Sequence, residues 1–335
     1  TGAVTVNTGT TTLNGTIAAT DVTIQAGGVL SSNGGGLATT AALSNAGTLA
    51  LTGGGAEAIA SLNGAGATTL SSGSLLTLDA GVSAISGVIS GAGGLTVQGT
   101  SATTLSGANT YTGTTTLTAG NLTLAGGSAI ADGAVLAVDG GLATLDADET
   151  VGGIAGAGGA LAIGANDLTF GGNDADAGFA GGITGLAGSD LEKVGTGTTT
   201  LSGTVSTAGT VTVTAGTLAL SGANTIAGIT VDAGTLRLLS DGAAGGGAGQ
   251  ITATGSVISY GNGINSATPI ALNSDDTQLE VLAADSAEQS GAITEDAQAR
   301  PIEKIGTGTL LLSGPNTFTG LTTVTAGTLN VQNGA

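Results

Sequence analysis

Short stretches of alternating polar and apolar residues recur along this chain, separated by small, turn-forming residues. In Thr210–Val213 the apolar side chains occupy every second position, which indicates a β-strand with one buried face. Gly216 then interrupts the alternation, and Thr217–Leu220 resumes it. The pattern therefore predicts many short strands joined by tight turns.

The spacing of equivalent apolar residues predicts how these strands are arranged. Val211 precedes Ile229 by the same 18 residues that separate Leu218 from Leu236. If one coil of chain has about that length, equivalent side chains stack on one another, and each strand pairs with the next at ~4.8 Å. The sequence therefore predicts an all-β fold, a parallel β-solenoid with small loop insertions. No convincing amphipathic helix interrupts it.

Glycine and asparagine recur at matching places in this frame and are interpreted as structural. Four glycines follow a small residue and precede a strand, where the chain must turn sharply, often with positive φ: Gly120, Gly216, Gly234 and Gly327. Three asparagines occupy matching corners, where Asn tolerates the left-handed region, bonds its own backbone and can stack into an amide ladder: Asn109, Asn224 and Asn316.

Longer repeats organise the chain above the level of single strands. Leu191–Thr198 (LEKVGTGT) matches Ile302–Thr309 (IEKIGTGT). Including degenerate copies, we expect repeats near 86–124, 183–239 and 290–331 within a single continuous solenoid spanning 1–335. The most charged stretch, Asp275–Arg300, is expected to be a solvated loop over a plain β coil.

The composition supports a thin, regular β interior and argues against disorder. The chain has 65 Gly, 8% charged and 1% aromatic residues, while 40% of residues are hydrophobic. A mean hydropathy of +0.42 with so few charges is unlike a disordered chain. Small and β-branched side chains suit stacked layers better than a bulky core.

Charge and residue types exclude several functions. With a net charge of -19, the surface repels nucleic-acid phosphates and anionic lipid. The absence of Cys rules out disulfides and thiolate metal sites, and no apolar run reaches the ~18 residues of a membrane helix. Because the chain begins without Met and shows no signal peptide, we expect a piece of a longer exported polypeptide.

The repeats resemble the passenger-associated transport repeat of bacterial autotransporters. Lys304–Gly314, continued through Thr317–Gly320 to Leu329, carries the fullest copy; the copy at Lys193 matches its first half and the copy at Ser106 its second half. The resemblance implies a right-handed parallel β-helix, exported through the outer membrane by a C-terminal barrel and located at the cell surface or outside the cell. It implies adhesion, aggregation or simple extension, and it carries no shared functional residues.

Candidate chemistry is sparse. There is no His for a triad or a zinc site, and the only basic residues are Lys193, Arg237, Arg300 and Lys304. Two of them follow Glu192 and Glu303 at one repeat position, which we interpret as exposed Glu–Lys pairs. We predict no catalytic residues and no cofactor. The densest carboxylates, Asp174 and Asp176, faintly resemble a calcium-binding nonapeptide and are weak calcium candidates.

The leading hypothesis is a non-enzymatic, structural or adhesive surface segment that acts as a stiff rod. It is expected to self-associate into fibres, or to mediate aggregation and biofilm adhesion, or to meet a surface glycan or protein receptor. Nucleic acid is not an expected partner, nor does this segment insert into a membrane. Two alternatives remain open: a polysaccharide-active β-helix enzyme, and an ice-binding β-solenoid with Thr-x-Thr pairs such as Thr210/Thr212 and Thr116/Thr118.

Overall fold

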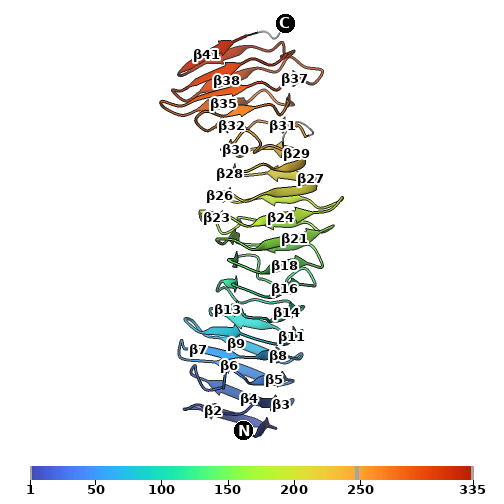
Figure 1. The fold of residues 1–335 in the computed structure, drawn as a ribbon, viewed down its shortest axis with the longest axis vertical. Coiled ribbons are helices and arrows are strands. Elements are labelled where there is room, and N and C mark those ends of the chain that lie inside the picture. Colours follow the sequence, from blue (N-terminus) through green and yellow to red (C-terminus); the bar gives the residue numbers. More distant parts are fainter. Residues whose placement is uncertain (1, 246–248, 333–335) are drawn as a thin grey trace. The chain divides into compact units, whose positions relative to one another are not determined.

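The computed structural model describes residues 2–245 and 249–332, and throughout these ranges the regular structure consists of β-strands. The chain divides into two compact units, residues 1–166 (unit 1) and 167–335 (unit 2). Within each unit, the strands of successive turns lie side by side along the stack (Figure 1). Every pairing given below is parallel, as the spacing of apolar residues predicted.

Unit 1 contains four sheets whose members follow the order of the turns. The first consists of β1 (Ala3–Val6), β3 (Asp21–Ile24), β5 (Ala42–Asn45) and β8 (Ser61–Asn63). The second consists of β2 (Gly9–Leu13), β4 (Gly28–Ser32), β6 (Thr48–Leu51), β9 (Ala67–Leu70) and β12 (Ile89–Gly91). The third consists of β7 (Ala56–Ile59), β10 (Leu75–Leu78), β13 (Gly94–Val97), β15 (Thr115–Leu117), β17 (Val135–Val138) and β20 (Gly153–Ala155). The fourth consists of β11 (Val82–Ile85), β14 (Ala102–Leu105), β16 (Asn121–Leu124), β18 (Leu142–Leu145) and β21 (Ala160–Gly164); β19 (Glu149–Val151) also lies in this unit.

Unit 2 repeats the arrangement. One sheet contains β22 (Leu168–Phe170), β24 (Gly182–Gly185), β25 (Leu191–Lys193), β27 (Val205–Val213), β29 (Thr225–Val231), β31 (Ile251–Ala253), β34 (Ile270–Leu272) and β37 (Ile293–Glu295). Another contains β23 (Ala177–Phe179), β26 (Thr198–Leu201), β28 (Thr217–Leu220), β30 (Thr235–Leu238), β32 (Val257–Tyr260), β35 (Thr277–Val281), β38 (Ile302–Ile305) and β40 (Thr322–Val324). The third contains β33 (Asn265–Ser266), β36 (Ser286–Gln289), β39 (Thr309–Leu312) and β41 (Thr328–Val331).

The register between turns is the one that the apolar spacing predicted. Val211 pairs with Ile229 and Leu218 with Leu236. All four side chains are at most 1% exposed, because alternate residues of each strand face the interior. The interior is thus a set of columns in which each Leu, Ile or Val packs on its counterpart one turn away. Removing one such side chain from water contributes about 1.5–3 kcal/mol.

The charged stretch Asp275–Arg300 follows the same plan as its neighbours. It forms β35, β36 and β37, with polar turns between them, so the expected β coil is present. In the turn before Pro301, Arg300 forms ion pairs with Asp275 (2.8 Å) and Asp296 (2.7 Å). Over the described part of the chain, no helix has the length and apolarity that crossing a bilayer requires.

These observations establish an all-β solenoid of stacked parallel turns in each unit. The expectation of one uninterrupted solenoid through 1–335, with repeat copies near 86–124, 183–239 and 290–331, stays a prediction. The stacked strands determine which positions face inward, and several polar side chains take inward positions.

Candidate functional site

Two of the repeat asparagines, Asn109 and Asn224, lie inside the solenoid and each connects three successive turns. The Asn109 Oδ1 accepts a hydrogen bond from the Ile89 N–H (2.7 Å), one turn earlier. Its Nδ2 donates to the carbonyl oxygen of Ala129 (2.8 Å), one turn later. Asn109 is 4% exposed, so both backbone groups are satisfied away from water. We call this arrangement an asparagine clasp.

The clasp recurs in unit 2. Asn224 accepts from the Val205 N–H (2.8 Å) and donates to the Ala243 carbonyl (2.7 Å). Asn316 accepts from the Ile293 N–H (2.9 Å), while its buried Nδ2 has no partner among the described residues. The structural interpretation of these three positions therefore fits, but its details were wrong. Each amide bonds backbone of neighbouring turns rather than another Asn, and none of the three has positive φ.

The repeat glycines serve two different backbone requirements. Gly120, Gly216 and Gly327 have φ of 80°, 62° and 74°, in the left-handed region that favours glycine. Gly234 is not among the positive-φ residues; a Cβ there would lie 2.7 Å from Val213 Cγ1 and 2.9 Å from the Gly216 carbonyl oxygen. Positive φ was therefore the wrong reason for Gly234, where close packing of one turn on the next excludes a side chain.

The two repeat lysines contradict the expectation of exposed Glu–Lys pairs. Lys193 and Lys304 are 0% and 1% exposed, because alternation along their strands turns them inward. The Lys193 Nζ donates to the carbonyl oxygens of Val194 (2.6 Å), Gly195 (2.9 Å) and, one turn later, Ala215 (3.4 Å). Burial lowers the pKa of Lys193, and nearby Asp174 and Asp176 oppose that change.

Lys304 repeats this geometry in the later copy. Its Nζ donates to the carbonyls of Ile305 (2.6 Å), Gly306 (2.8 Å) and Ala326 (3.3 Å), and burial lowers its pKa too. We call both arrangements lysine cages. The adjacent Glu192 and Glu303 face the other side of the strand, where Glu192 accepts from the Thr214 hydroxyl (2.8 Å) and Glu303 from the Thr325 hydroxyl.

Two buried glutamates form a third kind of interior contact, which the sequence reasoning missed. Glu149, 3% exposed, accepts from the consecutive N–H groups of Ala129 (3.1 Å) and Ile130 (2.9 Å). Glu57, 0% exposed, holds Gly36 (3.1 Å) and Leu37 (2.9 Å) in the same way. Burial raises the pKa of Glu149, and the two N–H donors oppose that rise. The alternation of Glu57 with Ile59 was the available signal of its inward position.

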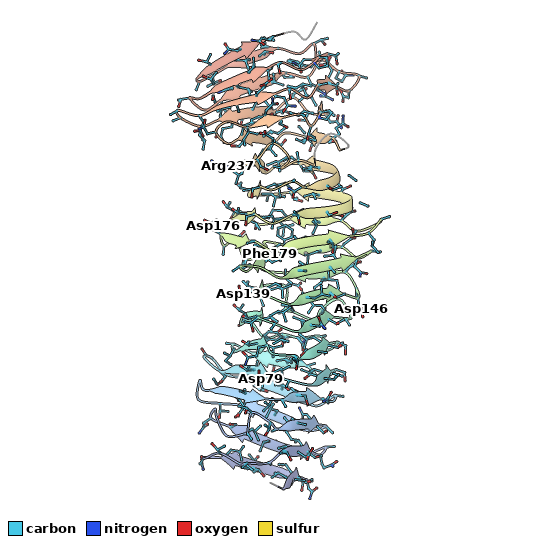
Figure 2. All side chains as sticks on the ribbon, in the orientation of Figure 1. Asp79, Asp139, Asp146, Asp176, Phe179 and Arg237 are labelled. Atoms are coloured by element: carbon cyan, nitrogen blue, oxygen red, sulfur yellow. The ribbon has the colours of Figure 1, made fainter. Side chains whose placement is uncertain are left out.

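The weak calcium candidates act as caps of the next turn. Asp174 Oδ1 accepts from the Thr196 N–H and Asp176 Oδ1 from the Thr198 N–H, both at 2.7 Å. The bond from Thr196 lowers the pKa of Asp174. Figure 2 shows Asp176 at the edge of the stack, away from the interior. Within residues 2–245 and 249–332, no three or more acidic, His or Cys side chains are grouped to hold a metal ion, so this geometry lends the calcium hypothesis no support.

A surface hollow in unit 2 brings three carboxylates together without the other residues of a sugar-cleaving site. It has a volume of about 310 Å³ and is lined by Asp167, Asp190 and Glu192 with four neutral residues. The Asp190 N–H donates to Asp167 Oδ1 (2.9 Å), and Asp190 Oδ1 accepts from the Thr210 N–H (2.6 Å). Neither a basic nor an aromatic side chain lines this hollow, whereas glycan cleavage typically draws on such groups.

The threonine pairs do not build a regular array. On the sheet that contains β27, the position of Thr212 is occupied in neighbouring strands by Thr230 and Thr252, but also by Glu192 and Ala271. Thr210 pairs with Gly228, so the column of threonines that would begin at Thr210 does not continue into the next strand. The outward face of this sheet therefore lacks the uninterrupted rows of threonine that ice binding would need.

Stacked parallel strands joined by interior clasps define a β-solenoid. The family model described as Passenger-associated-transport-repeat matches residues 95–125, 191–220, 215–238 and 302–331. The chain thus carries passenger-associated transport repeats, which confirms the resemblance seen in the sequence and fits the passenger domain of an autotransporter. This repeat family implies secretion to the cell surface. No curated protein and no solved structure matches the chain.

Proposed function

We propose that this chain is a non-enzymatic structural and adhesive part of a surface-exported passenger, which provides stiffness and a self-associating surface. The family matches support export, and the stacked turns support stiffness, since each turn pairs with its neighbours through backbone hydrogen bonds. The clasps and cages add side-chain links between turns. Together these features make each unit resist bending.

The observation that carries self-association is an uncharged face on unit 1. The strands β11, β14, β16, β18 and β21 contain no Asp, Glu, Lys or Arg. Along one outward column lie Val82 (69% exposed), Ala102, Asn121, Leu142 (38% exposed) and Ala160. A protein with a net charge of -19 is repelled by its own copies, except where two neutral faces meet.

The acidic residues flanking this face strengthen the argument. Asp79 directly follows β10 and Asp146 directly follows β18, and Figure 2 shows Asp146 at the edge of the stack. Two copies in contact through the neutral face keep these carboxylates at the rim, in water. The face is small, so each contact is weak, and many copies on one cell are needed for strong attachment.

The test is the settling of bacteria that display the chain on their surface. We expect displaying cells to aggregate and settle faster than cells without it. The double variant Val82→Asp/Leu142→Asp adds two charges to the face and should abolish the difference. The matched control Asn14→Asp/Ala65→Asp adds the same charge at exposed turns and should retain it. Equal settling of displaying and bare cells contradicts self-association, and release of reducing ends from surface glycans contradicts the non-enzymatic assignment.

A further inference from the structure

Near-identical turns make the pairing register of this solenoid ambiguous. The strand β28 (TLAL) pairs with β30 (TLRL), and many other strands have the same small polar–Leu–small–Leu pattern. Because side chains alternate with a period of two, a slip of two residues keeps every apolar side chain inward. Hydrophobic burial alone therefore distinguishes the native register weakly from its slipped neighbours.

We infer that the asparagine clasps are register keys, which select one pairing of successive turns. Asn109 meets one N–H and one carbonyl at 2.7 and 2.8 Å, in the turns before and after its own. A slip of two residues displaces the partner by about 6.6 Å along the strand, beyond hydrogen-bond reach. Ala129 lies in a bend outside the strands, so the slipped turn presents no equivalent carbonyl in its place, and the buried amide loses this partner, which is costly.

The segment around Ala129 shows how closely one turn is fixed. The carbonyl of Ala129 accepts a hydrogen bond from Asn109 in the preceding turn. The N–H groups of Ala129 and Ile130 donate to Glu149 in the following turn. Backbone groups of three consecutive turns are thereby matched to particular side chains. Apolar columns have no such requirement, because one Leu packs nearly as well as the next.

The lysine cages of unit 2 contribute little to this selection. Lys193 occupies an interior column between Phe170 and Val213. Its two short hydrogen bonds go to carbonyls of its own turn, and the carbonyl of the next turn, Ala215, is at 3.4 Å. The role of the clasps as register keys is independent of the proposed surface function, since it concerns how the chain selects its own fold.

The chain has no Cys, so pairs of introduced cysteines report the register directly. In the native pairing Thr104 lies opposite Thr123. The pair Thr104→Cys/Thr123→Cys is therefore within disulfide distance. The pairs Thr104→Cys/Asn121→Cys and Thr104→Cys/Ala125→Cys are offset by two residues, which places their Cα atoms about 8 Å apart, too far for a bridge. Each offset pair can close only in one slipped register.

The experiment refolds the full chain by dilution from denaturant, oxidises it and maps the disulfides by mass spectrometry. With native Asn109, we expect bridges at 104–123 and almost none at the offset pairs. Asn109→Leu removes two hydrogen bonds that only the native register makes, so offset bridges should rise about 30-fold. Asn14→Leu, at an exposed turn, should leave the pattern unchanged.

Two results would overturn the inference. One is an Asn109→Leu chain that folds and bridges only at 104–123, since the clasp then stabilises without selecting a register. The other is a chain with native Asn109 that already bridges at the offset pairs. If Asn109→Leu fails to fold, Asn109→Asp decides the question, because it keeps the acceptor for Ile89 and loses the donor to Ala129. It should raise the bridges in one slipped register, and unchanged bridging contradicts the inference.

Discussion

Replacing Lys193 by Met isolates the contribution of one lysine cage. Met preserves most of the side-chain volume in the interior column but removes the ammonium group. The carbonyls of Val194 and Gly195, now at 2.6 and 2.9 Å from Nζ, lose a charged donor, as does Ala215 at 3.4 Å. The side chain is 0% exposed, so water does not replace the donor without opening the turn.

Two opposing effects determine how much Lys193→Met changes the free energy of unfolding. Two short hydrogen bonds to a charged group contribute about 1.5–3 kcal/mol each, and the third is long enough to add little. Burial of the ammonium group opposes this gain, and an apolar side chain of similar size recovers part of that cost. We expect Lys193→Met to lower the free energy of unfolding by about 2–4 kcal/mol.

Tyrosine fluorescence during urea unfolding measures this effect. In a Tyr111→Phe background, Tyr260, which is 0% exposed in unit 2, is the remaining tyrosine and reports the unit that contains Lys193. Glu192→Gln is the matched control, because Glu192 faces outward next to Lys193 and accepts a hydrogen bond from the Thr214 hydroxyl. It should change stability by less than about 0.5 kcal/mol. A Lys193→Met chain as stable as the unmodified chain would refute the reasoning.

The pH dependence gives an independent check on the same variant. Burial lowers the pKa of Lys193 below its ordinary value of 10.5. Between the lowered pKa and 10.5, the unfolded chain therefore binds more protons than the folded chain. Linkage then makes stability rise with pH across that window. The Lys193→Met chain should lack this rise, and an identical slope in both chains would contradict a titrating, buried Lys193.

Three further predictions concern other interior positions. Burial raises the pKa of Glu149. The free energy of unfolding of the native chain should therefore fall as pH rises from about 4.5 through the raised pKa. In urea titrations at different pH, Glu149→Gln should remove this fall. Gly120→Ala places a Cβ against the Ser101 carbonyl at a φ of 80° and should lower the free energy of unfolding by about 2–4 kcal/mol. Gly133 has open space around it, so Gly133→Ala should lower it by under about 1 kcal/mol in the same urea titration. Both lysines are buried, Arg237 lies within a strand, and Arg300 precedes Pro301, a bond that trypsin cleaves poorly. Native chain should therefore stay intact in trypsin on a gel while urea-unfolded chain is cut, and rapid native cleavage would contradict the packing.

The strand frame was accessible from the sequence because it depends on local alternation and on spacing. Val211 and Ile229, and Leu218 and Leu236, pair as their separation predicted. The same alternation carries Lys193 to the inward face with Leu191. The expectation of an exposed ion pair gave the usual exposure of charged residues more weight than this alternation, and it was wrong for that reason.

The interior contacts were less accessible because their partners carry no side-chain signature. Asn109 bonds the N–H of Ile89 and the carbonyl of Ala129, groups that every residue of those turns also possesses. Which N–H and which carbonyl come within reach depends on turn lengths that vary along the chain. Recurrence therefore identified the asparagines as structural, while their function as clasps needed the three-dimensional register.

Electron microscopy of the purified chain tests the central claim most directly. A single continuous solenoid through both units, as the sequence predicts, together with a self-associating surface, predicts elongated particles that assemble into rods or fibres. Val82→Asp/Leu142→Asp should leave the elongated particles and remove the larger assemblies. Dispersed, compact spheres from the unmodified chain would contradict both the extended solenoid and the structural function proposed for it.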